Sequence, residues 1–156
     1  GRLPGTNRLE LTIGLPLRNR EALRDLLEKI YDPFHPEYQH YLAPAEFVER
    51  FGPSRQDYEA VIAFARARGL RITATHPNRM LLNVSGAVAD IERAFRVRMQ
   101  SYRHPTEARN FYAPDAEPSL DLQTRVLMID GLDNFSRPRP ANLRWVPQGR
   151  CLLLKA

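Results

Sequence analysis

Apolar and polar residues alternate in several short stretches of the chain. At residues 9–15 aliphatic positions alternate with polar or glycine positions, which predicts a strand with one buried face. Alternation on both sides of a His-Pro-Asn-Arg turn predicts a hairpin over residues 72–84. A further strand is expected at 97–101. The segments 103–114 and 124–132 indicate two more short strands, the last of them buried.

Helices are expected in four other segments. Asn19 offers the N-cap of the first helix, which should end before Pro33 because the residue preceding a proline is pushed out of helical geometry. A proline at the first position suits a short helix over 44–51. The clearest helix begins after Ser54, whose hydroxyl resembles half of a capping box, and the last helix covers 88–95.

In chain order these elements are a strand, a helix with inserted material, two strands, a helix and a strand. That order is typical of the ferredoxin-like split βαβ fold of the α+β class, an antiparallel sheet with helices on one face. The strand at 97–101 would complete this sheet. The inserted loop, its short helix and an extra hairpin are additions to the fold. The fold alone decides no function, because it carries many.

The net charge of +5 suggests a nucleic-acid partner until the charges are located. Five of the 23 basic residues and none of the 18 acidic ones lie after residue 135, so residues 1–135 carry 18 charges of each sign. Because basic and acidic residues are equal in number over residues 1–135, the charge of the domain does not indicate nucleic-acid binding. No apolar run is long enough to span a membrane.

Residues that could carry catalysis or bind a metal form no recognisable pattern. Cys151 lies in an irregular tail, and no serine or carboxylate has the context of a nucleophile or an acid–base pair. His35 and His40 are five residues apart, off the one-face spacing of a helical metal motif, and a zinc site needs more ligands. We therefore expect no catalytic residue, no metal and no cofactor.

Residues 31–54 are rich in aromatic residues and prolines, although they look like a connection. Once a metal or catalytic site is set aside, two interpretations stay open: a packed structural loop, or a surface for a partner protein. Pro33 and Pro36 would stiffen the segment. Under the structural interpretation, four aromatic residues anchor it to the core: Tyr38, Tyr41, Phe47 and Phe51.

Several motifs follow one another along the chain: LTIGLPLRNREALRDLLEKIYDPFHPEYQHYLAPAEFVERFGPS, NRMLLNVSGAVADIERAFRV, YRHP, NFYAP and IDGLDN. In this order they resemble the activation propeptide of the sedolisin (kumamolisin-type) serine-carboxyl peptidases. The similarity runs from about Leu9 to Asn134. It implies a ferredoxin-like domain that assists the folding of its peptidase, covers the active-site side and is removed at acidic pH.

The resemblance implies a propeptide domain over residues 1–135 and a basic linker remnant, expected to be flexible, over 136–156. In the family the linker runs toward the catalytic cleft and contains the processing site. This implies a cleft-directed segment here: Asn134, Phe135, Ser136, Arg137, Pro138 and Arg139. The aromatic residues expected to contact the peptidase are Tyr38, Tyr41, Phe111 and Tyr112. The histidines expected to respond to pH are His35, His40, His76 and His104.

Two alanines depart from the family's pattern. Ala43 and Ala87 stand where the family usually has threonine. If both are N-caps, each lost hydroxyl costs about 1 kcal/mol of stability. Ser85 is an alternative cap for the later helix.

We interpret the chain as a non-catalytic propeptide: an intramolecular chaperone and inhibitor of a sedolisin-type peptidase, in cis or in trans, released at acidic pH and secreted. No nucleic-acid or membrane partner is expected. The sequence ends before any Glu/Asp/Ser catalytic set, so the chain is not expected to be an enzyme. The alternative is a stand-alone propeptide-like interaction module that acts in trans. A weaker alternative gives the arginine-rich tail a role in binding polyanions or membranes.

Overall fold

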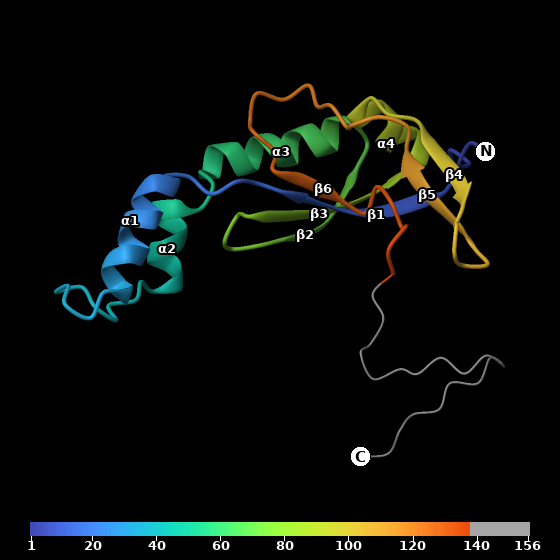
Figure 1. Ribbon diagram of the computed structural model, residues 1–156. Coiled ribbons are helices and arrows are strands. Elements are labelled where there is room, and N and C mark those ends of the chain that lie inside the picture. Colours follow the sequence, from blue (N-terminus) through green and yellow to red (C-terminus); the bar gives the residue numbers. More distant parts are fainter. Residues whose placement is uncertain (138–156) are drawn as a thin grey trace, which may run out of the picture.

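The computed structural model describes residues 1–137, and within that range the chain forms ten helices and strands (Figure 1). In chain order they are β1 (Arg8–Gly14), α1 (Arg20–Tyr31), α2 (Pro44–Phe51), α3 (Arg55–Ala67), β2 (Arg71–Thr75), β3 (Leu81–Ala87), α4 (Val88–Phe95), β4 (Met99–Arg103), β5 (Asn110–Pro114) and β6 (Met128–Asp130). The four predicted helices and the hairpin over residues 72–84 are confirmed. The α+β class is confirmed as well.

The main sheet has four strands in the order β2-β3-β1-β6, and each strand is antiparallel to its neighbours. The strands β4 and β5 pair with each other in a separate two-stranded sheet. The strand expected at 97–101 is therefore not the fourth strand of the main sheet. It begins at Met99, and β6 takes the edge position beside β1 instead. Alternation shows that a segment is extended, but it does not show which strand it pairs with.

The prediction that the last strand is buried is wrong. In β6 only Ile129 packs against the core, whereas Met128 is 48% exposed and Asp130 is also exposed. The strand has three residues and lies at the edge of the sheet. Successive strand residues point to opposite faces, so a three-residue strand places only its middle side chain in the core.

The core lies between the main sheet and the helices α3 and α4, which cover one face of the sheet (Figure 1). Leu11 and Ile13 from β1 and Val84 from β3 are buried on this face. Val61 of α3 and Phe95 of α4 are 0% exposed and belong to the same cluster. The period-two and helical patterns of the sequence thus meet in one core.

The opposite face of the main sheet is polar. Thr12 of β1 lies directly opposite Asn83 of β3 and Asp130 of β6, and Glu10 lies opposite Ser85. Directly paired residues of antiparallel strands share a face, so these five residues form one surface, which we call the open face. In Figure 1 both α3 and α4 lie on the other side of the sheet.

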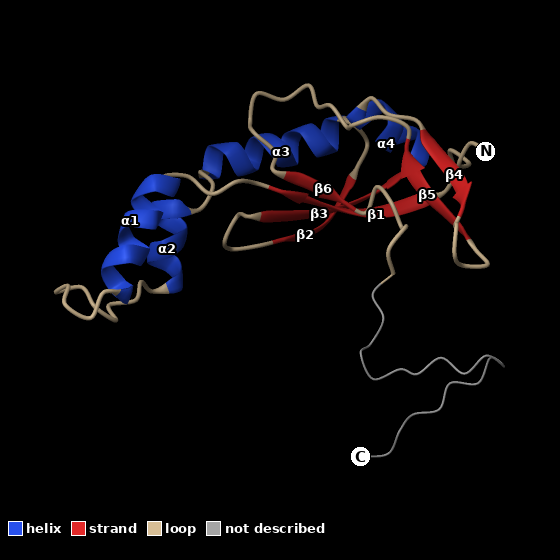
Figure 2. Cartoon of the chain, in the orientation of Figure 1, coloured by secondary structure: helices blue, strands red, loops and turns tan. Residues whose placement is uncertain are grey.

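Residues 20–51, which we call the arm, contain α1 and α2. Figure 2 shows these two helices side by side beyond one end of the main sheet. Each helix has one buried residue, Ile30 in α1 and Phe51 in α2. Neither residue belongs to the core cluster under the sheet. The arm therefore has a small core of its own.

Two arginines attach the C-terminal end of α2 to the rest of the domain. Arg18 donates hydrogen bonds to the carbonyl oxygens of Glu49 and Gly52. Arg79, in the turn between β2 and β3, donates to the carbonyl oxygen of Pro53 at 2.8 Å and to the Glu49 carboxylate at 3.1 Å. Cationic donors suit this end of a helix, because its last carbonyl groups have no partner within the helix.

Side-chain capping agrees with the sequence prediction at three of the four helix starts and differs at the fourth. The Ser54 hydroxyl accepts a hydrogen bond from the N–H of Asp57 at 3.0 Å, as predicted. Ala43 and Ala87 are both N-caps without a side-chain bond, and Ser85 does not replace the second, because Arg8 donates to its hydroxyl.

The prediction that Asn19 is the N-cap of α1 is confirmed for its position but not for a side-chain bond. Asn19 holds the N-cap position of α1 in a left-handed conformation with φ 48°, and its side chain makes no capping bond. Its amide donates instead to the carbonyl oxygen of Arg50 at 3.0 Å. The side chain therefore ties α1 to the end of α2 and does not cap its own helix.

Candidate partner-binding surfaces and linker clasp

The turn between β4 and β5 is folded around a buried histidine. His104 is 8% exposed, and its Nδ1 accepts hydrogen bonds from the backbone N–H groups of Thr106 at 3.3 Å and Glu107 at 3.1 Å. Because Nδ1 accepts these bonds, the proton of the neutral ring is on Nε2. The shape of the turn thus depends on an unprotonated nitrogen.

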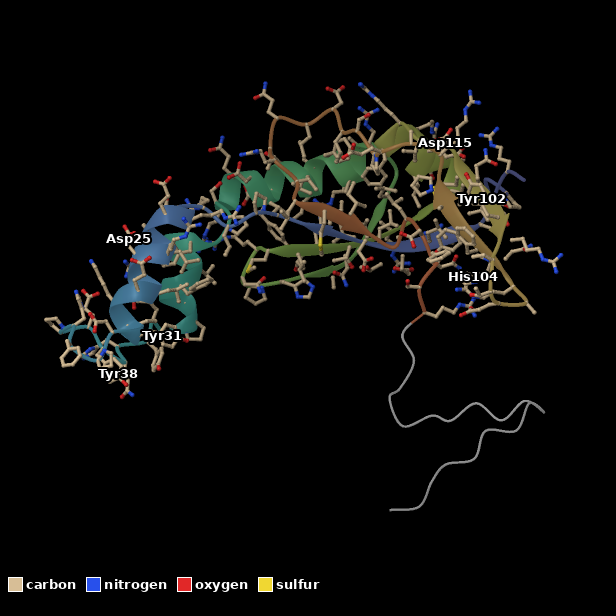
Figure 3. All side chains as sticks on the ribbon, viewed as in Figure 1. Asp25, Tyr31, Tyr38, Tyr102, His104 and Asp115 are labelled. Atoms are coloured by element: carbon tan, nitrogen blue, oxygen red, sulfur yellow. The ribbon has the colours of Figure 1, made fainter. Side chains whose placement is uncertain are left out.

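Aromatic rings from three segments form a cluster that includes His104. Figure 3 labels His104 and Tyr102 at this end of the molecule. Phe135, from the chain after β6, stacks on the His104 ring with centroids 4.7 Å apart. Phe111 of β5 meets both rings edge-on, at 5.9 Å and 5.0 Å. Tyr102 of β4 stacks on Phe111 at 5.4 Å. An aromatic pair contributes about 0.5–1.5 kcal/mol beyond its buried area, so this cluster ties the start of the linker to the hairpin.

The side chain of Arg109 holds the start of the linker by bonding to backbone carbonyl groups of that segment. Its guanidinium donates to the carbonyl oxygens of Asn134, at 2.9 Å, and of Phe135. It also donates to the carboxylate of Glu107, and its side chain is 14% exposed. The planar guanidinium presents several donors in fixed directions, so one side chain can fix two successive carbonyl groups.

Asn134 also pairs with the outer edge of β5. Its Oδ1 accepts from the N–H of Tyr112 at 2.7 Å, and its own N–H donates to the Tyr112 carbonyl oxygen at 3.2 Å. The Tyr112 hydroxyl donates to the carbonyl oxygen of Gly131 at 3.4 Å. Burial raises the pKa of Tyr112, and the carboxylates of Asp133 and Asp130 raise it further, so the hydroxyl stays a donor.

We call this arrangement the clasp. Its members are His104, Glu107, Arg109, Phe111, Tyr112, Asn134 and Phe135. It brings together five of the residues proposed from the sequence, which come from the separate sets for pH response, partner contact and linker. Ser136 and Arg137 follow it and are exposed. Pro138 and Arg139, like Cys151 and the rest of the expected flexible tail, lie outside the described residues.

The arm carries a second group of aromatic residues. Phe34 is 97% exposed, Tyr41 is 65% exposed and Tyr38 is 38% exposed. The expectation that Tyr38 and Tyr41 anchor the insertion to the core is therefore wrong. Phe51 is buried, but outside the core cluster under the sheet, and Phe47 packs on it with ring centroids 5.5 Å apart. Figure 3 shows Tyr38 at the opposite end of the molecule from His104. A partner contact by Tyr38 and Tyr41 stays a prediction.

The four histidines do not form a cluster. His35 and His40 lie on the arm, where Nδ1 of His35 accepts from the N–H of Glu37 at 3.1 Å. His76 is in the turn between β2 and β3, and its Nε2 lies 3.4 Å from Oδ1 of Asn83. Of the four, only His104 is buried.

A groove of about 490 Å³ lies between the β1–α1 connection and residues 123–127. Its lining includes Leu15, Pro53 and Val126, with the charged residues Arg18, Arg20, Asp57 and Arg125. Arg18 is already bonded to α2, and Asp57 to Ser54. The groove therefore presents two exposed arginines beside an apolar floor.

Residues 1–137 contain neither a metal-binding cluster nor a membrane-spanning helix. No group of three or more histidine, cysteine or acidic side chains in this range could hold a metal ion. Among the helices of the same range, the longest has 13 residues, and none is long and apolar enough to cross a bilayer.

Arg109 and Glu107 belong to the clasp but were not proposed from the sequence, and neither was Tyr102, which stacks on Phe111. Arg109 reaches a carbonyl group 25 residues further along the chain. A single arginine in a polar turn has no local signal that would indicate such a contact. His104 and Phe135 were proposed separately, and only the fold places them together.

Comparison with known proteins gives consistent matches. Residues 1–135 match the family described as "Pro-kumamolisin, activation domain". Xanthomonalisin of Xanthomonas sp. (strain T-22) is 32% identical over 131 residues, which cover 82% of this chain and 16% of that protein. Sedolisin of Pseudomonas sp. (strain 101) is 25% identical, with 83% and 22% covered, and kumamolisin of Bacillus sp. (strain MN-32) is 24% identical, with 90% and 25% covered.

The chain thus spans at most a quarter of the length of these relatives. The matched family is an activation domain and not a peptidase domain, and the match includes every helix and strand described above. The chain belongs to the pro-kumamolisin activation domain family.

Proposed function

We propose that this domain is the propeptide of a sedolisin-type serine peptidase, and that it helps the peptidase to fold and inhibits it until removal. The observation that carries the proposal is the family match over residues 1–135, which ends at the last residue of the clasp. A domain of this family has a peptidase as its partner. The parent protein would then be a secreted endopeptidase.

The open face is the best candidate for the surface that docks on the peptidase. Its residues are paired across β1, β3 and β6, and Glu10, Thr12, Asn83 and Asp130 carry hydroxyl, amide and carboxylate groups that can bond to a partner, whereas Ser85 is buried. Helices cover only the other side of this sheet (Figure 1). The exposed aromatic residues of the arm would extend this contact, since exposed aromatic residues are enriched in protein interfaces.

The segment that enters the peptidase cleft would begin after the clasp. Asn134 and Phe135 are held by Arg109 and by stacking on His104. Ser136 and Arg137 are the first exposed residues that follow. This divides the predicted segment over 134–139 into a held part and a part that would reach the cleft.

We also infer a ferredoxin-like arrangement for the main sheet. The order β2-β3-β1-β6 supports it, because β3 lies between β2 and β1 and every neighbour is antiparallel. In this interpretation β6 is the fourth strand, and β4 with β5 is an inserted hairpin.

Release in acid would follow from charge. Residues 1–135 carry 18 charges of each sign, so protonation of carboxylates and histidines leaves the domain strongly positive. A positive domain repels itself and its arginine-rich linker. Inhibition of a sedolisin-type peptidase should therefore weaken as the pH falls, and inhibition that grows stronger in acid would contradict this mechanism.

The docking proposal is tested by inhibition of a purified sedolisin-type peptidase. Thr12→Arg places a large charge on the open face, and we expect it to raise the inhibition constant by about tenfold or more. Ala63→Arg, on an exposed position of α3, is the matched control and should leave the constant unchanged. Circular dichroism checks that both variants are folded. No inhibition by the folded wild-type chain, or equal effects of the two variants, would contradict the proposal.

A further inference from the structure

We propose that the clasp is an acid-sensitive lock on the start of the linker, which opens when His104 gains a proton. Its biological meaning rests on the proposed function, because the linker would then be the segment that a peptidase cuts. The lock itself is a property of this chain alone.

The first step is the hydrogen bonding of His104. Its Nδ1 accepts from the N–H groups of Thr106 and Glu107. A protonated imidazole has N–H donors at both nitrogens and no acceptor. The Thr106 hydroxyl, 3.4 Å from Nδ1, could accept the new proton, but the two N–H groups would have lost their acceptor. Leaving such groups unpaired in a buried site is unfavourable, so the turn between β4 and β5 must rearrange.

The charges around His104 decide whether the proton could be accommodated without this change. Arg109, on the same turn, would repel a charged ring. Glu107 would attract it, but its carboxylate is 28% exposed and is already bonded to Arg109. Asp133, on the linker side, is bonded to the N–H of Phe135 and exposed. Attraction by partly solvated carboxylates is weak, whereas both N–H bonds are lost whenever Nδ1 is protonated.

The second step connects the turn to the linker. Glu107 orients Arg109, and Arg109 holds the carbonyl groups of Asn134 and Phe135. The ring of Phe135 rests on His104 itself. A rearranged turn therefore removes the stacking partner and the guanidinium donor together. This coupling releases Phe135 and the carbonyl group of Asn134 together, and leaves Asn134 held by its two bonds to Tyr112.

The closed clasp also limits where the chain can be cut. A peptidase binds the backbone of its substrate in extended form, but here the carbonyl groups of Asn134 and Phe135 are bonded to Arg109. While the clasp is closed, cleavage is confined to bonds beyond Phe135. Opening adds the peptide bond between Asn134 and Phe135, while the bonds of Asn134 to Tyr112 still hold the chain before it.

The test is an NMR titration of the whole chain from about pH 8 to about pH 5, the range in which imidazoles usually gain a proton. We expect the imidazole nitrogens of His104 and the amide signals of Thr106, Glu107 and Asn134 to change with one common midpoint. As the pH falls through this midpoint, the hydrogen-exchange protection of the Asn134 amide, corrected for the intrinsic rate, should fall by about tenfold. A decrease of this size corresponds to the loss of about two ordinary hydrogen bonds.

Two variants and a control separate the lock from general acid effects. His104→Asn keeps a side-chain acceptor that does not titrate, so Asn134 protection should no longer depend on pH. Arg109→Gln should lower Asn134 protection at every pH, although the bonds of Asn134 to Tyr112 remain, while Thr106 and Glu107 still respond to His104. His35→Asn makes the same replacement at the comparable Nδ1 acceptor on the arm and should leave the transition unchanged.

The lock is overturned if Asn134 protection in the wild type does not change with pH, or if His104→Asn keeps the wild-type transition. Neither result affects the inhibition assay, which tests the proposed function separately. Conversely, a chain that inhibits no peptidase could still show the transition.

Discussion

At the scale of single residues, Glu92 links the stability of the domain to pH. Its side chain is 10% exposed and accepts from Arg2 at 2.7 Å and from the N–H of Met99 at 2.8 Å. Burial acts to raise the pKa of Glu92, but the bonds from Arg2 and Met99 and the charges of Arg2 and Arg98 outweigh it, and the pKa is lowered. The carboxylate is thus stabilised in its charged form.

A lowered pKa fixes the sign of the pH dependence. The stabilisation is fully present above the ordinary value of 4.5 and is lost as the pH falls through the lowered folded value. We expect Glu92→Gln to lower the free energy of unfolding by about 1–3 kcal/mol near neutral pH, where a charged hydrogen-bond acceptor is lost. The difference from the wild type should shrink below about pH 4.

Urea unfolding at about pH 7 and about pH 3 measures this difference. Asp90→Asn is the matched control on the same helix, because the ion pair of Asp90 with Arg93 is largely exposed and should contribute less than about 1 kcal/mol. If Glu92→Gln lowers the free energy of unfolding by the same amount at neutral and acidic pH, the stabilising role of the charged Glu92 carboxylate is contradicted.

At the scale of secondary-structure elements, three of the four helices begin without a side-chain cap, and in two of these the N-cap is an alanine. Ala43 and Ala87 have extended backbones with ψ near 150°, the conformation in which a serine or threonine hydroxyl reaches the first turn. Pro44 already sets the geometry of the first turn of α2, but it cannot supply the missing acceptor. In α4 the N–H groups of Val88 and Ala89 already donate to the carbonyl oxygens of Asn7 and Gly5, so a hydroxyl at position 87 would bond to the next N–H, that of Asp90. In α2 a hydroxyl at position 43 could satisfy an N–H group of the first turn.

Restoring the hydroxyl should therefore stabilise the domain. We expect Ala43→Ser and Ala87→Ser each to raise the free energy of unfolding by about 0.5–2 kcal/mol. Ala45→Ser, on an exposed position inside α2, is the control and should be neutral or slightly destabilising, because serine has a lower helix propensity than alanine. Thermal and urea unfolding measure all three. A stabilisation by Ala45→Ser equal to that by Ala43→Ser would show that capping is not the cause.

At the scale of the whole molecule, the arm and the sheet differ in how firmly they are built. The helices α3 and α4 each bury four residues, whereas α1 and α2 bury one each. The bonds that join the arm to the body include those from Arg18 to the carbonyl oxygen of Glu49 and from Arg79 to the carbonyl oxygen of Val48. Regions with few buried apolar contacts open at lower free energy than the core.

We expect the arm to open before the sheet. In native-state hydrogen exchange at low urea, amides of α1 should exchange while those of β1 and β3 stay protected. Ile30→Ala should lower the opening free energy of the arm by about 2 kcal/mol or more, because a buried isoleucine is removed, and should leave the sheet unchanged.

Val61→Ala, in the main core, is the comparison and should lower the protection of the sheet and α3. If Ile30→Ala lowers the protection of arm and sheet equally, the two open as one unit and this division of the molecule is wrong.

The sequence predicted those parts of the fold that depend on near neighbours. The end of α1 before Pro33, the Ser54 cap and the hairpin of β2 with β3 each depend on residues a few positions apart, and each is found. Strand pairing depends on distant residues, which is why β4 was assigned to the wrong sheet and the three-residue β6 was expected to be buried.

The candidate site follows the same division. His104, Phe111 and Phe135 were each singled out by residue type, but nothing local indicated that they pack together. Arg109 was missed because its partners lie 25 and 26 residues away. For Tyr38 and Tyr41 the residue type suggested core packing, and the arm instead exposes them because it extends beyond the sheet.

The position of the clasp has a mechanical consequence. Tension applied to the linker meets the contacts of Phe135 and Asn134 first, then the buried side chain of Leu132, and only then the edge strand β6. These contacts would break one after another, so each carries the load in turn. When a folding or moving partner pulls on the linker, the contacts of the clasp with the hairpin would therefore break before the force acts on the main sheet.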